Sequence, residues 1–400
     1  MNRRDLLKIG GLAAAASPLL VRSAFAAEEP ILFGVPYPMS GNYAANGKYG
    51  AQGAKLFIDY EKSAIGRPLQ YKILDTQGTP ATAVRLVQDL LEQGKARFFI
   101  GPLISSTTLA VGDALNKLGG VMISTAGADE ITGKDCKRAM FRWSVPTYGA
   151  IRETIGPLIK AHPNAKRWYT ITPQYVFGEG LLKATKDILK ENKLELVGNS
   201  YHSLSEHEFS GYLTNAMAQK PDVLVLLNFS TQSSEALRQA VSFGMKKNTI
   251  ILMAWASGLE QFQSLGADLC DGVYFGVQYW HQIDSPANKE LVKRTQATFH
   301  ENPNYSLAGS YLGFQIFTTA IKKANSTDPA KVIAAMEGAR YQGLTGEETI
   351  RKADHQVIKN YYLLKGKAKS AMKNKDDYAD IIHSGQSFLS PEQAGCQMKA

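Results

Sequence analysis

Short uncharged apolar runs alternate with amphipathic helical patterns along most of the chain. The run at residues 98–100 contains only Phe and Ile, which is typical of a parallel strand buried on both faces. Hydroxyl residues follow at 105–108, and such side chains are preferred at the start of a helix. Apolar residues then recur every three or four positions from Leu109 to Leu118. We therefore expect a helix that packs with one face and directs its free N–H groups beyond the strand end.

The same alternation indicates two successive series of strands and helices. In the first series, strands are expected at 31–35, 71–74, 98–100 and 120–125, with helices at 47–62, 80–93 and 109–118. In the second, strands are expected at 167–172, 194–201, 222–228 and 249–255, with helices at 179–192, 209–219 and 233–243. A crossing near 276–280 precedes helical patterns at 287–299, 307–324 and 329–337. Strands separated by helices in this way predict an α/β fold of doubly wound parallel sheets, and 400 residues suffice for two lobes.

The N-terminus has the pattern of an export signal. Arg3 and Arg4 precede an apolar segment at 9–20, which ends near Ala24-Phe25-Ala26. That segment is too short to cross a bilayer, which requires about 20 apolar residues. We therefore predict a cleavable signal of the twin-arginine type over residues 1–26 and a mature protein in the periplasm.

Composition and charge give no indication of a nucleic-acid partner. Hydrophobic residues make up 44% of the chain and charged residues 20%, as in ordinary folded proteins. The formal charge of +9 falls to +6 without residues 1–26, which hold four basic residues and one acidic residue. The most basic stretch, 359–375, is followed by Asp376 and Asp377, so we interpret it as a solvated surface.

The three cysteines are too far apart in sequence for a metal site or a redox pair. Cys136 lies in a loop after a strand of the first series, and Cys396 lies near the end of a weakly patterned tail. Cys270 directly precedes an expected strand. In an oxidising compartment we predict a Cys136–Cys396 disulfide that holds the tail, with Cys270 free.

Motifs that would indicate an enzyme are incomplete. A dinucleotide-binding turn requires Gly-x-Gly-x-x-Gly, and the nearest run, at 178–183, lacks the third glycine. A hydrolase nucleophile turn requires Gly-x-Ser-x-Gly, and at 309–313 the serine is displaced. Possible metal ligands gather in one polar loop before a helix, at His202, Glu206, His207 and Glu208. We expect neither catalysis, nor a cofactor, nor a bound metal.

Several motifs, each weak alone, follow one another in a specific order. They lie at residues 34–41, 100–102, 105–106, 141–142, 177–180, 208–210, 237–240 and 244. In this respect the chain resembles the type I periplasmic substrate-binding proteins of ABC importers, in the leucine/isoleucine/valine-binding family. The resemblance covers nearly the whole mature chain. It implies two doubly wound lobes joined by three hinge crossings, a ligand held between the lobes, and membrane permease subunits as partners.

This family organisation suggests how the chain is divided. We expect 27–145 plus 280–350 in the first lobe, and 146–279 plus 351–400 in the second lobe and tail. Residues 142–146, which contain Pro146, are a candidate hinge. We expect a monomer. The sequence leaves open whether the protein serves import or acts as the ligand-sensing subunit of a membrane receptor.

The first lobe offers groups that suit a carboxylate. Ser105 and Ser106 stand at a helix start, where N–H groups and hydroxyls favour anions. Backbone N–H groups at Ala126, Gly127 and Ala128 follow the next strand. The resemblance implies that this lobe holds the carboxylate of the ligand.

The second lobe differs from that of the amino-acid binders in the family. Phe177 and Phe229 occupy the positions where those relatives carry tyrosines, and Trp255 lies at or next to the position of their acidic residue. Tyr43 is expected to line the same cleft. With no carboxylate there to pair an ammonium group, we predict an apolar, aromatic carboxylic acid such as a benzoate or phenylpropenoid. The alternative is a branched-chain amino acid or an amide.

Overall fold

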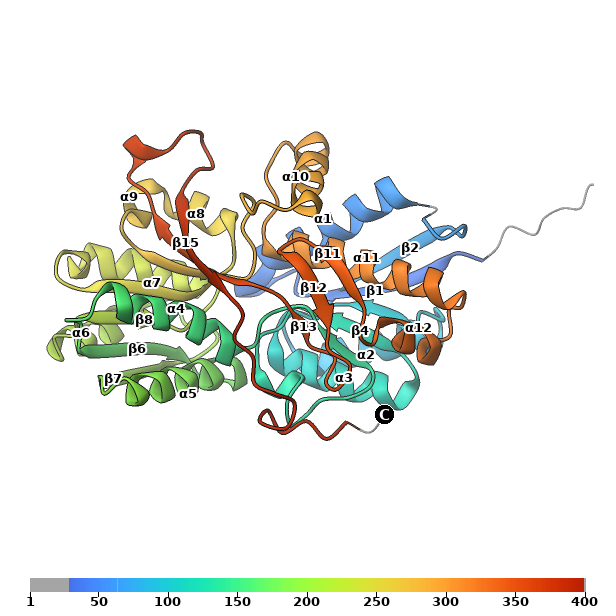
Figure 1. Cartoon of the computed structure of the whole chain (residues 1–400), viewed down its shortest axis with the longest axis horizontal. Coiled ribbons are helices and arrows are strands. Elements are labelled where there is room, and N and C mark those ends of the chain that lie inside the picture. The colour runs from blue at the N-terminus through green and yellow to red at the C-terminus, as the bar shows by residue number, and fades with distance from the viewer. Residues whose placement is uncertain (1–28, 63, 399–400) are drawn as a thin grey trace, which may run out of the picture.

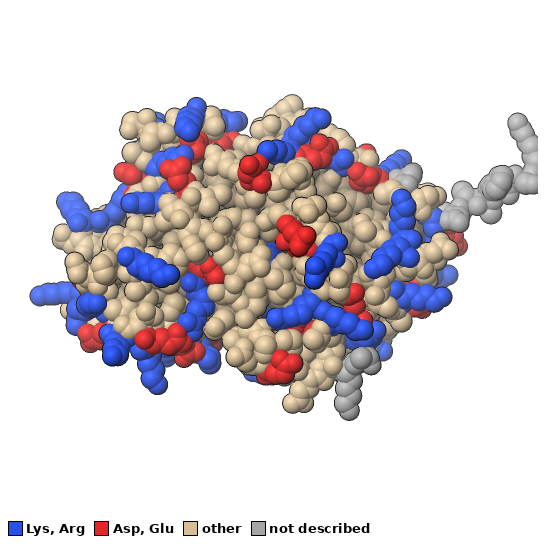
Figure 2. All heavy atoms as spheres, viewed as in Figure 1, with Lys and Arg blue, Asp and Glu red and all other residues tan. Residues whose placement is uncertain are grey.

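The computed structural model describes residues 29–62 and 64–398, which form two lobes lying side by side (Figure 1). The predicted export signal, 1–26, lies outside these residues. Within the described ranges, every helix is too short or too polar to cross a membrane. On the face seen in Figure 2, basic and acidic side chains are interspersed over both lobes.

The first lobe is built on a five-stranded parallel sheet of order β2-β1-β3-β4-β5. Its strands are β1 (Ile31–Tyr37), β2 (Leu69–Asp75), β3 (Phe98–Ile100), β4 (Val121–Ser124) and β5 (Met140–Arg142). The connecting helices are α1 (Ala44–Glu61), α2 (Pro80–Glu92) and α3 (Ser105–Leu118), and short 3-10 turns occur at η1 (Gly41–Tyr43) and η2 (Asp129–Ile131). These elements confirm the fold class predicted for this half of the chain.

Strand β3 is buried on both faces, as its composition predicts. Phe98 packs against Phe317 with ring centroids 5.3 Å apart. Phe99, which points to the opposite face, joins a separate core cluster with α2 and α3. Because neighbouring residues of a strand face opposite sides, a fully apolar strand requires helices on both faces of its sheet.

The second lobe is built on a seven-stranded sheet of order β15-β14-β10-β9-β8-β6-β7. The parallel strands are β6 (Arg167–Pro173), β7 (Glu195–His202), β8 (Val223–Leu226), β9 (Ile250–Ala256) and β10 (Tyr274–Val277), and the antiparallel edge consists of β14 (Tyr361–Gly366) and β15 (Ala379–Gly385). Its helical segments are α4 (Thr147–Ala161), α5 (Val176–Glu191), α6 (Ser210–Ala218), α7 (Thr231–Ser242), η3 (Met245–Lys247), α8 (Leu259–Leu265), α9 (Ala267–Cys270) and η4 (Lys369–Ala371). The antiparallel strands β14 and β15 were not expected from the sequence pattern.

The chain returns to the first lobe between these strands. It forms α10 (Pro286–Phe299), α11 (Tyr305–Ala324), α12 (Pro329–Met336) and a small sheet of β11 (Arg340–Gly343), β12 (Gly346–Ile350) and β13 (Val357–Ile358). The expectation that all of 351–400 belongs with the second lobe is wrong at its start, because β13 pairs with β12. Only the later strands β14 and β15 join the seven-stranded sheet.

Three passages of the chain between the lobes are bonded to one another. They run between β5 and α4, between β10 and α10, and between β13 and β14. The side chain of Gln278 bridges the first two, since Val145 N donates to its Oε1 at 2.9 Å and its Nε2 donates to Val145 O at 2.8 Å. Lys359 of the third passage donates to Gln278 O at 2.7 Å and lies 4.5 Å from the ring centroid of Trp143.

The basic stretch 359–375 is not uniformly solvated, contrary to our interpretation of its charge pattern. Lys359 has no exposed surface, and this burial lowers its pKa to about 7. Lys367 pairs with Asp377 at 2.7 Å and with Asp380 at 2.8 Å. The sequence shows where the charged residues are, but it does not show which lysine side chains are buried in the folded protein.

The disulfide arrangement is the one that the sequence analysis predicted. Cys136 and Cys396 are joined, with Cα atoms 5.6 Å apart, and Cys270 is free and buried. The bond attaches the C-terminal tail, which emerges from the second lobe, to the first lobe.

Candidate ligand-binding site between the lobes

The strand ends of the first lobe meet the start of α3 in a hydrogen-bonded loop. Ser105, which is 2% exposed, accepts the N–H of Ala128 through Oγ at 3.1 Å. Ser124 Oγ accepts the N–H of Ala126 at 3.0 Å, and Ser144 Oγ donates to Ala126 O at 2.6 Å. The loop is thus held against the helix N-terminus, and the Ser105 hydroxyl keeps its own proton for donation.

Further hydroxyl groups beside this loop have donor capacity that the described residues do not use. Thr107 Oγ1, in the first turn of α3, is buried without a hydrogen-bond partner among them. The Tyr37 hydroxyl, at the end of β1, lies near the Thr125 hydroxyl, but neither group has a partner in hydrogen-bond geometry there. Burial raises the pKa of Tyr37 to about 12, so this hydroxyl stays protonated. A buried polar atom without a partner is unfavourable, and a ligand oxygen would satisfy it.

Aromatic rings from both lobes form what we call the aromatic cluster: Tyr43, Phe177, Phe229 and Trp255. Phe177 and Trp255 meet edge to face with centroids 5.0 Å apart, and Phe177 and Phe229 lie 6.5 Å apart. Tyr43 of the first lobe stacks on Phe229 of the second at 6.0 Å. All four side chains are at most 7% exposed. They lie together because parallel strands direct their carboxyl ends to one edge of the sheet.

Gly127 is the point where the polar loop meets the aromatic cluster. A Cβ at this position would lie 2.6 Å from Trp255 Cη2 and 2.7 Å from Phe177 Cε2. Real Cβ atoms do not approach so closely, so the backbone of the loop passes directly against the two rings. The structure therefore brings the loop and the cluster together, as their predicted common role requires.

Ser106 is the predicted site residue with the least structural support. It follows Ser105 in α3 but is only half-buried. In the described ranges it has no side-chain hydrogen bond to the loop.

The lobes contact each other through several polar bonds that sequence reasoning missed. Asn42 donates to Leu204 O at 2.9 Å, and Ser230 Oγ donates to Asn46 Oδ1 at 2.8 Å. Asn304, which caps α11, donates through Nδ2 to Glu260 Oε2 at 2.8 Å. Single polar residues of this kind have no local pattern that separates them from ordinary surface positions.

Glu260 corrects the expectation that this part of the second lobe lacks a carboxylate. Glu260 is the second residue of α8. Its Oε1 is buried without a hydrogen-bond partner among the described residues. Burial raises the pKa of the Glu260 carboxyl, while Ser257 and Asn304 lower it by hydrogen bonding. In the described ranges, neither Glu260 nor another carboxylate forms a hydrogen bond or ion pair with the aromatic cluster.

The histidine and glutamate loop before α6 is organised by local hydrogen bonds. Glu206 accepts the backbone N–H groups of His207 and Glu208, each at 3.0 Å, and the Tyr212 hydroxyl at 2.8 Å. Glu208 accepts the N–H of Ser210 at 2.8 Å. These carboxylates order the start of the helix.

Comparison with known proteins agrees with this architecture. Residues 30–371 match the model of a family described as periplasmic binding protein. The solved structure of an amino acid ABC transporter substrate-binding protein from Pseudomonas fluorescens Pf-5 is 56% identical, with a TM-score of 0.89, and the match covers 92% of this chain and 99% of that chain. The Leu/Ile/Val-binding protein BraC3 of Rhizobium johnstonii is 23% identical over 88% of this chain and 96% of its own length.

A third protein shares the fold at lower identity. It is a solute-binding protein of an ABC transporter from Rhodopseudomonas palustris BisB5, solved in complex with 3,4-dihydroxybenzoic acid. The two chains are 23% identical with a TM-score of 0.81, covering 91% of this chain and 99% of that chain. The chain belongs to the periplasmic binding protein family, and it is similar over most of its length to ABC-transporter substrate-binding proteins and to Leu/Ile/Val-binding proteins.

Proposed function

We propose that this protein is the periplasmic solute-binding subunit of an ABC importer and that its two lobes close around an aromatic carboxylic acid. One observation carries the ligand class: a polar loop suited to a carboxylate lies directly against the aromatic cluster at Gly127. The import role rests on the family. The predicted signal at 1–26 supports the periplasmic location.

The carboxylate half of the proposal rests on the N-terminus of α3. A helix of this length carries partial positive charge at its first turn, where the N–H groups lack partners within the helix. The Ser105 hydroxyl stands at that turn. In the loop that it holds, the N–H groups of Ala126 and Ala128 already donate to Ser124 and Ser105, which leaves the Gly127 N–H for a ligand oxygen. Hydrogen bonds to a charged oxygen contribute about 1.5–3 kcal/mol each, which is enough to select an anion.

The aromatic half rests on the surroundings expected for the rest of the ligand. An amino acid would bring an ammonium group, and burying that group unpaired costs several kcal/mol. An aromatic ring among Tyr43, Phe177, Phe229 and Trp255 would instead gain about 0.5–1.5 kcal/mol for each ring pair beyond its buried area. The R. palustris protein supports the proposal in that the same fold holds a dihydroxybenzoic acid.

An amino acid is the second candidate, and two observations favour it. The P. fluorescens protein, 56% identical, is named as an amino acid transporter component. Glu260 supplies a buried carboxylate oxygen at the lobe interface. An ammonium group would have to reach that oxygen past the Asn304 amide, which already donates to the other oxygen of the same carboxylate.

The expected mechanism is a population shift. Each lobe supplies part of the contacts, and only the closed arrangement makes both sets at once, so the ligand stabilises that arrangement. The closed form is then recognised by the permease. A sensing role would use the same closure with a receptor as the partner.

A thermal-shift screen on ligand-stripped protein tests the proposal. Benzoates, phenylpropenoids, branched-chain amino acids, short amides and dicarboxylates are compared at equal concentration. We expect the largest stabilisation from an aromatic acid, by RT ln(1 + [L]/Kd) at the chosen concentration. Stabilisation by leucine or valine at micromolar concentration, with none from any aromatic acid, would contradict it.

A further inference from the structure

We propose that residues 386–396, here called the C-terminal strap, form a fourth and covalently anchored connection between the lobes that limits how far they separate. The inference rests on the lobe closure described under the proposed function. It goes beyond ligand recognition, because the groups that anchor the strap, Glu153, Gly149 and Cys136, lie outside the aromatic cluster.

The strap is fixed to the second lobe at its start. It continues from β15, the edge strand of the seven-stranded sheet. Ser387 Oγ and His383 Nε2 both bond to the carboxylate of Glu153 in α4. A Cβ at Gly149 of α4 would overlap the carbonyl oxygen of Ser387, so the strap lies directly on that helix.

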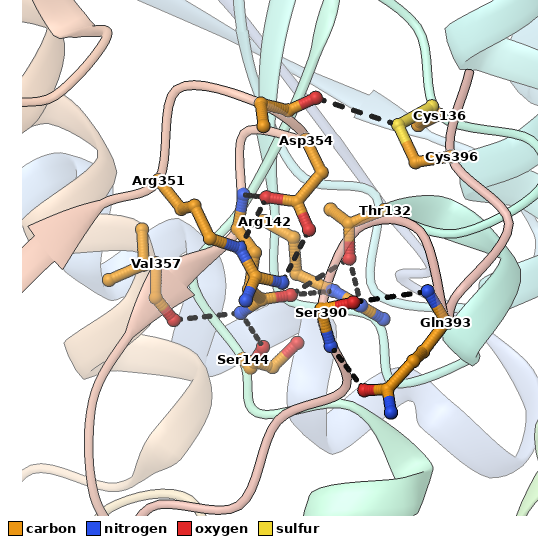
Figure 3. A network of polar contacts seen from close by, with 12 residues as sticks. Thr132, Cys136, Arg142, Ser144, Arg351, Asp354, Val357, Ser390, Gln393 and Cys396 are labelled. Carbon is orange, nitrogen blue, oxygen red and sulfur yellow. Dashed lines mark hydrogen bonds and ion pairs between the residues drawn. A yellow bond between two sulfur atoms is a disulfide. The ribbon is translucent and has the colours of Figure 1, made fainter. Parts of the chain in front are cut away.

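The end of the strap is fixed to the first lobe. Cys396 is bonded to Cys136, and a Cβ at Gly133 would lie 2.7 Å from the carbonyl oxygen of Ala394. Figure 3 shows this end, with the disulfide at one side and Ser390 and Gln393 facing each other across a turn. The turn is closed by Ser390 N donating to Gln393 Oε1 at 3.0 Å and Gln393 N donating to Ser390 Oγ at 3.2 Å.

Between these anchors the strap crosses the hinge. Phe388 and Leu389 line one small pocket together with Pro146 of the first passage, Arg142 at the end of β5 and Asp354 shortly before β13. Arg142 Nε donates to Gln356 Oε1 at 2.7 Å, and Gln356 Nε2 donates to Ser144 O at 2.9 Å, so the strap lies beside a buried hydrogen-bonded network (Figure 3).

The strap also forms one wall of a pocket between the lobes. This pocket, of about 430 Å³, is lined by Gln393 and Ala394 of the strap. Glu130 and Lys134 line it from the first lobe, and Lys183 of α5 lines it from the second. Separation of α5 from the 130–134 segment would widen this pocket and pull on the strap.

The geometry gives the strap a limited reach. A moderate separation of the lobes can be accommodated by unfolding the Ser390–Gln393 turn. A larger one cannot, because the chain between Ser387 and Cys396 spans at most about 3.3–3.6 Å per residue when fully extended. Restricting the open arrangements lowers their conformational entropy and so favours the closed arrangement. A disulfide that merely pinned the tail to one lobe would have no such effect.

The first test compares the wild-type protein with the C136S/C396S variant by small-angle scattering without ligand. We expect a larger radius of gyration for the variant, and equal radii when both are saturated with the best ligand of the screen. The Kd of that ligand should rise about threefold to tenfold, mainly through faster dissociation. Equal ligand-free radii would overturn the proposal, and this comparison does not depend on knowing the ligand.

A second variant keeps the disulfide and lengthens the strap instead. About eight Gly and Ser residues inserted between Leu389 and Ser390 form a flexible linker that removes the restraint. The control carries the same insertion between Asn325 and Ser326, in the α11–α12 loop of one lobe. We expect the strap insertion to enlarge the ligand-free protein as the cysteine variant does, and the control insertion to leave the lobe separation unchanged. An equal response of both insertions would overturn the proposal even if the cysteine variant folds poorly.

Discussion

The two sides of the lobe interface use different chemistry. The first lobe presents hydroxyls and the free backbone N–H groups at the start of α3, beside a loop, 124–128, that Ser124 and Ser105 hold through the N–H groups of Ala126 and Ala128. The second lobe presents Phe177, Phe229 and Trp255, all buried. Backbone groups at the carboxyl edge of a parallel sheet follow from the fold and suit any carboxylate. Under the proposed function, the aromatic side chains opposite them would select which carboxylate is bound.

We expect the largest effect from a substitution at Gly127, where the polar loop of the first lobe packs on the aromatic rings of the second. In Gly127→Val, the new side chain would overlap the rings of Trp255 and Phe177, so the lobes could not approach to their present distance. We expect affinity for the best aromatic acid to fall about 100-fold, as overpacking costs of 1–3 kcal/mol allow. Isothermal titration measures the loss. Gly211→Ala is the control, since a Cβ there meets nothing within 4 Å; an unchanged affinity for the valine variant would refute the proposed closure.

Trp255→Ala tests the aromatic side. It removes a ring that is 2% exposed and packs on both Phe177 and Tyr361, so we expect about 3–5 kcal/mol lower stability and an affinity about 30-fold weaker for an aromatic acid. Urea unfolding and titration give the two values. Phe262→Ala, in the core of the same lobe, should lower stability similarly and spare binding. Equal binding losses in the two variants would show that Trp255 acts only through stability.

Ser105→Ala and Ser106→Ala test which serine of the first lobe contributes to ligand binding. Loss of the Ser105 hydroxyl leaves the Ala128 N–H without its acceptor and removes a donor to the ligand, so we expect about tenfold weaker binding. For Ser106, which is half-buried, we expect a change of about twofold or less. Titration of both variants with one ligand makes the comparison, and a larger loss for Ser106 would reverse the assignment.

The smallest expected effect concerns pH. Burial raises the pKa of the Glu260 carboxyl in the arrangement where the lobes touch. A raised pKa means that the closed arrangement binds the Glu260 proton more tightly than the open one does. Protonation therefore stabilises closure fully at pH values below the ordinary carboxyl pKa. This stabilisation is lost as the pH rises through the raised pKa of Glu260. We expect the wild-type Kd to increase over that range, and Glu260→Gln to bind more tightly and to flatten the profile. The control is Glu347→Gln, which changes an exposed carboxylate. If Kd depends on pH in Glu260→Gln as it does in the wild-type protein, Glu260 has no part in closure.

Much of the fold could be predicted because it rests on local periodicity. The all-apolar run at β3 and the hydroxyl residues that open α3 follow from neighbouring residues, as do most strands of both parallel series. Candidate ligand residues of the first lobe, such as Ser105, could also be named, since the carboxyl ends of parallel strands collect at one edge. The second-lobe candidates Phe177, Phe229 and Trp255 came from the family resemblance. The pairing of Cys136 with Cys396 followed from where each lies relative to the expected strands.

What the sequence alone determined was therefore most elements of the two parallel series, the fold class and the kinds of group available at the strand ends. Only the tertiary structure decided that β13 leaves the second lobe, that Lys359 is buried in the hinge, that Glu260 bonds to Asn304 and that Gly127 touches Trp255. Each of these depends on residues far apart in the chain. Local periodicity reports which face of an element is apolar, whereas the partner of a single polar or glycine residue is set by how the two lobes pack together.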